Sequence, residues 1–257
     1  MDDEVITWEI AGPVARIRIS RPQKRNALAT RHWQALETAL DAVAASPAHI
    51  VVLSGSSGAF SAGADIDELG EMLVTPERFV DSNAVVQRAQ RKLRRLPATT
   101  LAVIDGACVG GGLGLALACD LRLASERSRF AITPARLGLV YSADDSRGLV
   151  HVVGMARARE MLLTGRVLDA ATADAWGLVH EVAVVAALEE RAEALVESLR
   201  ASSGQARRGI KTVLGYLGGD PAISAEDADA AFAGAFASTD FAEGAAAFLG
   251  KRPPAFP

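Results

Sequence analysis

Two short segments rich in glycine and other small residues are the first candidates for chemistry. One covers residues 59–66 (AFSAGADI) and the other covers residues 105–113 (DGACVGGGL). Each follows a short apolar stretch and precedes a helical pattern, so each is expected to lead into a helix. Such a turn exposes backbone N–H groups at a helix N-terminus, where the helix dipole also favours negative charge. Glycine in addition lets a ligand approach the backbone closely.

Three interpretations of the second segment are open from the residues alone. Gly110, Gly112 and Gly114 form G-x-G-x-G, which differs from the G-x-G-x-x-G of dinucleotide-binding turns and lies in the middle of the chain. A purely structural role, in which the glycines allow a helix to pack closely on a strand, fits the same residues. The third interpretation is an oxyanion hole, in which two N–H groups hold an oxygen that becomes negative during a reaction.

The elements that would position these segments alternate between strand and helix patterns. Residues 5–10 and 14–19 alternate apolar and polar residues around Ala11-Gly12-Pro13, which predicts a β-hairpin. Further strands are predicted over residues 50–53, 101–104, 121–124 and 179–182, with a loop over residues 55–63. Helices are predicted over residues 30–46, 76–96, 111–119, 144–152, 155–163, 170–176 and 186–200. This alternation favours an α/β core, and the alanine-rich end, interrupted at residues 218–221, predicts a helical tail.

The bulk composition limits the class of protein. The chain has 257 residues, a formal net charge of −4 and 50% hydrophobic residues, which is ordinary for a globular protein and argues against a general nucleic-acid binder. Cys108 and Cys119 form no C-x-x-C or Cys/His cluster, so buried free thiols are expected and a metal site is not. Residues 1–4 are acidic, unlike a signal peptide, and no stretch predicts a membrane span. A cytoplasmic protein is therefore expected.

Segments along nearly the whole chain resemble the crotonase (enoyl-CoA hydratase/isomerase) superfamily. The two glycine-bearing segments, in this order, look like the family signature. The other matching segments are Arg21-Pro22 with Asn26-Ala27-Leu28, Phe130 with Leu137-Gly138-Leu139, Leu163-Thr164-Gly165 with Gly177-Leu178-Val179, and Phe248, Lys251, Arg252, Pro253 and Phe256. Each match alone is weak, and it is their order along the chain that supports membership.

The resemblance implies a fold, an assembly and a ligand. The fold is an α/β crotonase-like core of stacked ββα turns over residues 1–200, followed by a helical trimerisation region over residues 201–257. The assembly is a homotrimer or hexamer, and the ligand is an acyl-CoA thioester, with CoA as part of the substrate and no tightly bound cofactor. By position, the N–H groups of Ala64 and Gly111 would form the oxyanion hole. The residues expected along CoA are Arg25, Ala62, Ala64, Asp65, Ile66 and, from a neighbouring subunit, Lys251.

Two positions depart from the family pattern. Hydratases of the family use two glutamates, and the corresponding positions in this chain hold Gly114 and Pro134. Neither side chain can activate water or protonate the α-carbon of the acyl group. General acid–base catalysis of that kind typically contributes roughly 10²- to 10⁴-fold. The chain therefore resembles a divergent member of the family, for which ordinary hydration is not expected.

Three nearby residues are candidates for the missing proton-transfer groups. Tyr141, with Thr133-Pro134 and Leu137-Gly138, resembles a segment of methylmalonyl-CoA decarboxylases, whose tyrosine lies near the acyl group. Asp144 and Asp145 follow, although both also fit the start of a helix, where the dipole favours carboxylates. The hypotheses left open are an acyl-CoA enzyme that catalyses hydration, isomerisation or decarboxylation, a non-catalytic acyl-CoA-binding protein, and a structural oligomer whose glycine loops only pack.

Overall fold

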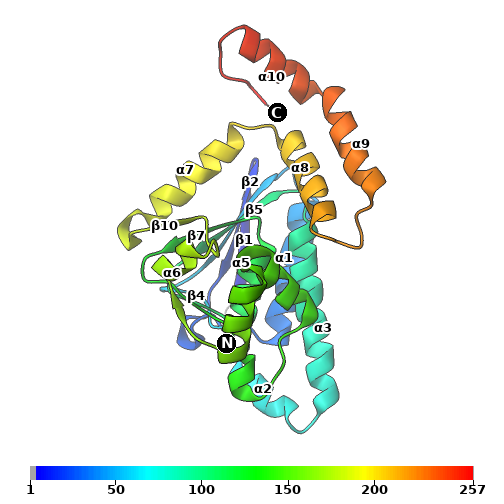
Figure 1. The fold of residues 1–257 in the computed structure, drawn as a ribbon. Helices are drawn as coiled ribbons and strands as arrows, with labels where there is room; N and C mark the ends of the chain where they lie inside the picture. The colour runs from blue at the N-terminus through cyan, green and yellow to red at the C-terminus, as the bar shows by residue number, and fades with distance from the viewer. Residues whose placement is uncertain (1–3, 257) are drawn as a thin grey trace.

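Two β-sheets form the framework of the computed structural model, which describes residues 4–256 (Figure 1). The larger sheet contains, in spatial order, β1 (Ile6–Ala11), β2 (Val14–Ile19), β3 (Ile50–Gly55), β5 (Thr99–Ile104), β7 (Leu121–Ser125) and β10 (Glu181–Ala183). The hairpin β1–β2 is antiparallel, and all other neighbouring pairs in this sheet are parallel. Every residue of the central strand β5 is buried, as expected for a parallel strand that is covered on both faces.

The smaller sheet is built from strands that directly follow those of the larger one. It contains, in spatial order, β4 (Ala59–Ser61), β6 (Ala107–Val109), β8 (Arg129–Ala131) and β9 (Leu168–Asp169). Because β3, β5 and β7 each lead into one of its strands and then into a helix, the stacked ββα arrangement is confirmed. The prediction of a loop over residues 55–63 is wrong at its centre, since β4 lies there. Its three buried residues are too few to show the alternation that marks a strand.

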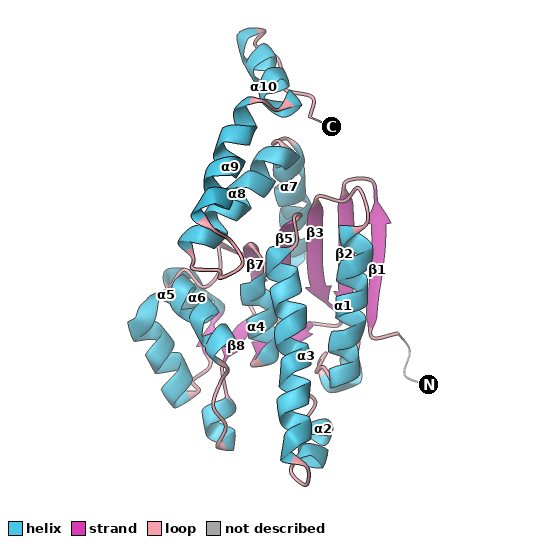
Figure 2. Cartoon of the chain, turned by 90° about the vertical axis from the view of Figure 1, so that its right-hand side faces the viewer, coloured by secondary structure: helices cyan, strands magenta, loops and turns pink. Residues whose placement is uncertain are grey.

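Helices cover both faces of the larger sheet. Since successive side chains of a strand point to opposite sides, each strand can pack against helices on both faces. Those of the core are α1 (Thr30–Ala44), α2 (Ile66–Met72), α3 (Pro76–Arg95), α4 (Gly111–Ala118), α5 (Ala143–Thr164), α6 (Ala170–Ala175) and α7 (Leu188–Arg200), with 3-10 turns η1 (Pro22–Lys24), η2 (Pro134–Leu137) and η3 (Val185–Ala187). Figure 2 shows α1 and α3 lying over one face. In β3, Val51 and Leu53 join the main core, whereas Ile50 and Val52 pack in the cluster that contains α7.

Most predicted boundaries agree with the structure, and two differ in addition to the loop over residues 55–63. The helices predicted over residues 144–152 and 155–163 are the two halves of α5, which is interrupted at Gly154 by a φ of 78°. The strand predicted over residues 179–182 lies at Glu181–Ala183 instead. Both predicted thiols, Cys108 and Cys119, are free and buried, and burial raises the pKa of Cys119 to about 12.

The last three helices form an arm that extends away from the sheets (Figure 1). They are α8 (Gly204–Leu217), α9 (Ala225–Phe236) and α10 (Thr239–Leu249), and the predicted interruption at residues 218–221 falls between the first two. Large apolar side chains of this arm are exposed to solvent: Leu214, Leu217, Phe232, Phe236, Phe241 and Phe248. Within residues 4–256, none of the helices has the length and apolar character that crossing a membrane requires.

Candidate active site

The two glycine-bearing loops lie against each other because they follow neighbouring strands. β4 and β6 are parallel and paired, so the loops leave the sheet at the same edge. Gly63 is the point of contact. A Cβ atom at this residue would lie 2.7 Å from the carbonyl oxygen of Val109 and 3.3 Å from the nitrogen of Gly111, and its φ is +93°. Only glycine fits both the close approach and this backbone conformation.

The backbone N–H groups of Ala64 and Gly111 take no part in the pairing of Leu28 with the first loop or in the hydrogen bonds within α4. Leu28 pairs with the first loop as in a parallel sheet, donating to Gly63 O at 2.7 Å and accepting from the N–H of Asp65 at 3.1 Å. Since alternate N–H groups of an extended segment point to opposite sides, that of Ala64 points away from Leu28. Gly111 is the first residue of α4, so its N–H has no acceptor within the helix. Ala64 and Gly111 line the same pocket.

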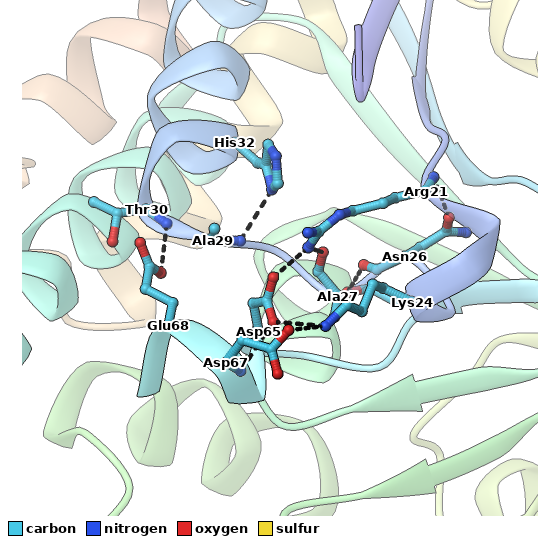
Figure 3. Close-up of polar contacts among 11 residues, drawn as sticks. Arg21, Lys24, Asn26, Ala27, Ala29, Thr30, His32, Asp65, Asp67 and Glu68 are labelled. Carbon is cyan, nitrogen blue, oxygen red and sulfur yellow. Dashed lines mark hydrogen bonds and ion pairs between the residues drawn. The ribbon is translucent and has the colours of Figure 1, made fainter. Parts of the chain in front are cut away.

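The first loop is anchored from outside the pocket by buried ionic contacts (Figure 3). Arg21 Nη1 lies 2.5 Å from Asp65 Oδ2 and donates to Ala27 O at 3.2 Å. Asp65 also caps α2, because its Oδ1 accepts from the N–H of Asp67 at 3.1 Å. Burial by itself would raise the pKa of Asp65, but Arg21, the Asp67 N–H and Lys24 lower it. The Asp65 carboxylate is therefore committed to holding the loop, and the lining residues of this stretch are Ala62, Ala64 and Ile66.

Asn26 is a second anchor, whose role was not predicted from the sequence. Its Oδ1 accepts from the N–H of Arg21 at 2.7 Å, and its Nδ2 donates to Ser56 O and Ala59 O at 2.9 and 2.6 Å. The adjacent Arg25 is exposed, and its carbonyl oxygen accepts from the N–H of Ala62 at 3.0 Å. The early segment that contains Asn26 thus supports the loop. The predicted contact of the Arg25 side chain with a phosphate stays a prediction.

A pocket of about 180 Å³ opens beside Ala64 and Gly111. Trp33 forms its floor under Gly111, where an added Cβ would lie 3.3 Å from Cζ2 of the indole. Most of the wall is apolar and comes from α2, α3 and the loop before α5: Leu69, Met72, Phe79, Val86, Leu139 and Val140. Polar side chains are also present, among them Tyr141, Ser142 and Asp145 at the start of α5. The pocket suits an apolar group that must meet a few polar atoms.

Asp145 and Tyr141 converge on the backbone of Gly114. A Cβ atom at Gly114 would lie 2.6 Å from Asp145 Oδ1, 2.7 Å from Gln90 Nε2 and 2.9 Å from the Tyr141 hydroxyl. Real Cβ atoms do not approach other atoms so closely, so a larger residue at this position of α4 would displace its neighbours. The missing side chain of Gly114 leaves the space that α5 and the preceding loop fill with a carboxylate and a phenol.

The two oxygens of Asp145 have different surroundings. Oδ2 accepts from Gln87 Nε2 and from Ser142 Oγ, both at 2.6 Å. Oδ1 is buried and has no hydrogen-bond partner within residues 4–256. Burial raises the pKa of Asp145, and Ser142, Gln87 and Gln90 oppose this. The Tyr141 hydroxyl donates to Gly110 O at 3.0 Å, and burial together with Asp145 raises its pKa, so the phenol stays protonated.

Two predicted site residues lie outside this pocket. Asp144 pairs with Arg91 at 2.8 Å and lies 3.7 Å from Arg147. Among the described residues, it is not one of those that line the pocket. The structure therefore assigns it to a surface ion pair. Lys251 follows α10, which lies at the opposite end of the molecule from the pocket-lining helix α2 (Figures 1 and 2). Its predicted contact involved a neighbouring subunit and stays a prediction.

The stacked ββα fold, with a largely apolar pocket lined by Ala64 and Gly111 where the two glycine-bearing loops meet, defines a crotonase-like class of protein. The family model described as enoyl-CoA hydratase/isomerase matches residues 9–257. A Thermus thermophilus protein provisionally named an enoyl-CoA hydratase is 37% identical over 252 residues, which cover 95% of this chain and 98% of that protein. The chain therefore belongs to the enoyl-CoA hydratase/isomerase family, whose members act on acyl-CoA thioesters.

Two further relatives show how broad the similarity is. The 4-chlorobenzoyl coenzyme A dehalogenase-2 of an Arthrobacter species is 34% identical over 203 residues, covering 78% of this chain and 74% of that protein. A crystal structure described as an enoyl-CoA hydratase/carnithine racemase from Magnetospirillum magneticum matches with a TM-score of 0.92 and 33% identity. That match covers 100% of this chain and 96% of the other. The similarity extends over the whole fold.

Proposed function

We propose that this chain is an enzyme that forms the enolate of an acyl-CoA thioester. The N–H groups of Ala64 and Gly111 would hold the thioester oxygen as it becomes negative. Support comes from the contact at Gly63, which brings the two loops together, and from the pocket that both residues line. Each preorganised donor contributes about 3 kcal/mol in oxyanion holes that have been tested by mutation. CoA enters as part of the substrate, and the reaction needs no resident cofactor.

Asp145 lies over Gly114, and this placement is the main support for the proposal. By its resemblance to family hydratases, the chain has Gly114 and Pro134 where their two glutamates stand. Asp145 Oδ1 lies 2.6 Å from the place where a side chain at position 114 would begin. A carboxylate from α5 thus reaches the space of a side chain from α4. This makes a non-catalytic acyl-CoA-binding protein the weaker alternative.

A single buried carboxylate suits proton transfer better than addition of water. Asp145 Oδ1 would take a proton from the α-carbon, and the electron pair would pass to the thioester oxygen held by Ala64 and Gly111. The same carboxyl group would then return the proton to a carbon of the extended enolate. Its raised pKa makes it a stronger base than an exposed aspartate. The reaction supported best is therefore isomerisation of an acyl-CoA double bond.

Exchange of α-protons tests enolate formation without knowledge of the natural substrate. Butanoyl-CoA in D₂O is followed by proton NMR with the wild-type protein, Asp145→Asn and Tyr141→Phe. We expect the asparagine variant to lose about 100-fold or more of the exchange rate, as is typical when a general base is removed. Asp144→Asn is the matched control, because Asp144 lies in a surface ion pair one residue away.

Other outcomes separate the alternatives. Full exchange in Asp145→Asn would contradict the assignment of the base. A non-catalytic binding protein would be favoured if calorimetry shows tight acyl-CoA binding but neither α-proton exchange nor turnover of any enoyl-CoA or malonyl-type thioester is detected. Release of CO₂ from a malonyl-type thioester that persists in Asp145→Asn would instead support decarboxylation, which requires the oxyanion hole but no base.

A further inference from the structure

The buried face of α3 carries a polar side chain, Gln87, that takes no part in the proton transfer proposed above. Gln87 is 7% exposed and points its amide at Asp145, 58 residues further along the chain. Burying an amide costs free energy unless it forms hydrogen bonds, and a leucine would satisfy this core position without that cost. The contact therefore calls for an explanation beyond packing.

Gln87 and Ser142 divide the Asp145 carboxyl group into two unequal oxygens. Ser142 Oγ accepts from the N–H of Asp145 at 3.1 Å as the N-cap of α5, and it directs its own proton to Oδ2. Gln87 Nε2 supplies the second donor to the same oxygen. In the charged carboxylate, these two donors occupy the two lone pairs of Oδ2, which leaves Oδ1 as the oxygen open to a proton. Oδ1 is the oxygen that lies beside Gly114.

We propose that Gln87 is a positioning residue that, with Ser142, makes Oδ1 of Asp145 the atom that receives and returns the proton. The inference rests on the proposed function, because it concerns the group assigned there as the base. Without Gln87, the carboxyl group gains rotational freedom, and its proton can reside on either oxygen. The donor also stabilises the charged form of Asp145, so its removal favours the neutral acid.

Titration of Asp145 separates this role from simple packing. The carboxyl signal of ¹³C-labelled protein is followed by NMR as the pH changes, with Asp145→Asn identifying the resonance. Gln87→Met removes the donor at similar length, and Gln87→Glu replaces it with an acceptor. We expect Gln87→Met to raise the titration midpoint by about one pH unit, the size of one hydrogen bond to a charged group. Gln87→Glu should raise it further, because a second carboxyl group beside Asp145 disfavours its charged form. The α-proton exchange rate should fall at least several-fold, with its pH dependence displaced by the same amount.

The control is Gln34→Met, which makes the same substitution at an exposed position on α1. If Gln87→Met and Gln87→Glu lower Tm but leave the Asp145 midpoint and the pH dependence of exchange unchanged, Gln87 only packs and the inference is overturned. Failure of the proposed function gives a different result. In that case the wild-type protein shows no exchange or Asp145→Asn retains it, whereas the NMR midpoint still reports whether Gln87 acts on Asp145.

Discussion

At the scale of single residues, the candidate base is held at a cost to stability. Asp145 is 6% exposed and has one oxygen without a hydrogen bond among the described residues, so its charged form is poorly solvated. Functional groups are often placed in such environments because burial adjusts their pKa. The same burial that makes Asp145 a stronger base therefore makes the folded state less stable when the carboxyl group is ionised.

This cost predicts a pH-dependent gain in stability for Asp145→Asn. The folded-state pKa lies above the unfolded value of 3.8, so the folded protein binds the proton more tightly. The contribution of Asp145 to stability is therefore most favourable below about pH 4 and declines as the pH rises through its folded-state pKa. We expect Asp145→Asn to have the higher Tm at pH 8, with the difference vanishing near pH 4. Calorimetric melting at both pH values measures it, and a lower Tm at pH 8 would contradict it.

A substitution at Gly114, which lies beside Asp145, is expected to lower stability instead of raising it. An alanine there would place Cβ within 3 Å of Asp145, Gln90 and Tyr141, which must all shift. We expect Gly114→Ala to lose about 1–3 kcal/mol of unfolding free energy, as is usual for overpacking, and to lose α-proton exchange. Gly70→Ala in α2 is the control, because nothing lies within 4 Å of its added Cβ. That variant should gain about 0.5–1 kcal/mol in urea unfolding.

At the scale of elements, the first loop is held by the junction of η1 with α2. Asp65 joins the two, because it pairs with the buried Arg21 and caps the helix. We expect Asp65→Ala to lose about 3–5 kcal/mol of unfolding free energy, since it leaves the Arg21 charge buried without its partner. Denaturant unfolding measures this loss. Asp67→Asn, at an exposed ion pair with Lys24, should change little, and equal effects of the two variants would refute the anchoring role.

The same junction predicts sensitivity to acid. Arg21 and its neighbours lower the pKa of Asp65 below 3.8, so its contribution to stability is present above about pH 4. The contribution is lost as the pH falls through the folded-state pKa, because the unfolded chain then binds the proton more readily. We expect the difference in unfolding free energy between wild type and Asp65→Ala to shrink between pH 5 and pH 3. A difference that stays constant over that interval would place the effect in packing.

At the scale of the whole molecule, the C-terminal arm exposes more apolar surface than a monomer would be expected to leave uncovered. Phe236 lies between Phe232 and Phe241, with ring centroids 5.5 and 5.7 Å apart, and all three side chains are more than half exposed. Exposed apolar clusters of this kind mark contacts between proteins. The predicted homotrimer or hexamer would cover this surface with copies of the same chain.

Light scattering on the purified protein tests the predicted assembly. We expect a mass of three or six chains, and a shift toward one chain in Phe236→Asp, because a charge placed in an apolar interface is costly. Val74→Asp is the control, since Val74 is 85% exposed between α2 and α3, away from the arm. A wild-type protein that runs as a monomer would overturn the prediction and leave the exposed phenylalanines unexplained.

The sequence by itself determined the α/β fold, the family and the two loops, because these depend on local patterns. Strand alternation, helical spacing and glycines in the loops can be recognised without knowledge of distant contacts. It also marked Tyr141 and Asp145 as candidates, but it could not rank Asp145 above Asp144, since both fit the first turn of a helix. Adjacent residues of a helix point in different directions, and only packing decides which one is buried.

The tertiary structure decided which groups share the site. Asp145 reaches Gly114 only because α5 packs beside α4, and Gln87 reaches Asp145 only because α3 lies on the same core. It also placed the Asp65 side chain in a buried pair with Arg21, a contact across 44 residues. Such contacts leave no periodic signal in the chain, because they depend on how whole elements pack. Local patterns therefore identified the two glycine-bearing loops, and long-range packing supplied the carboxylate beside them.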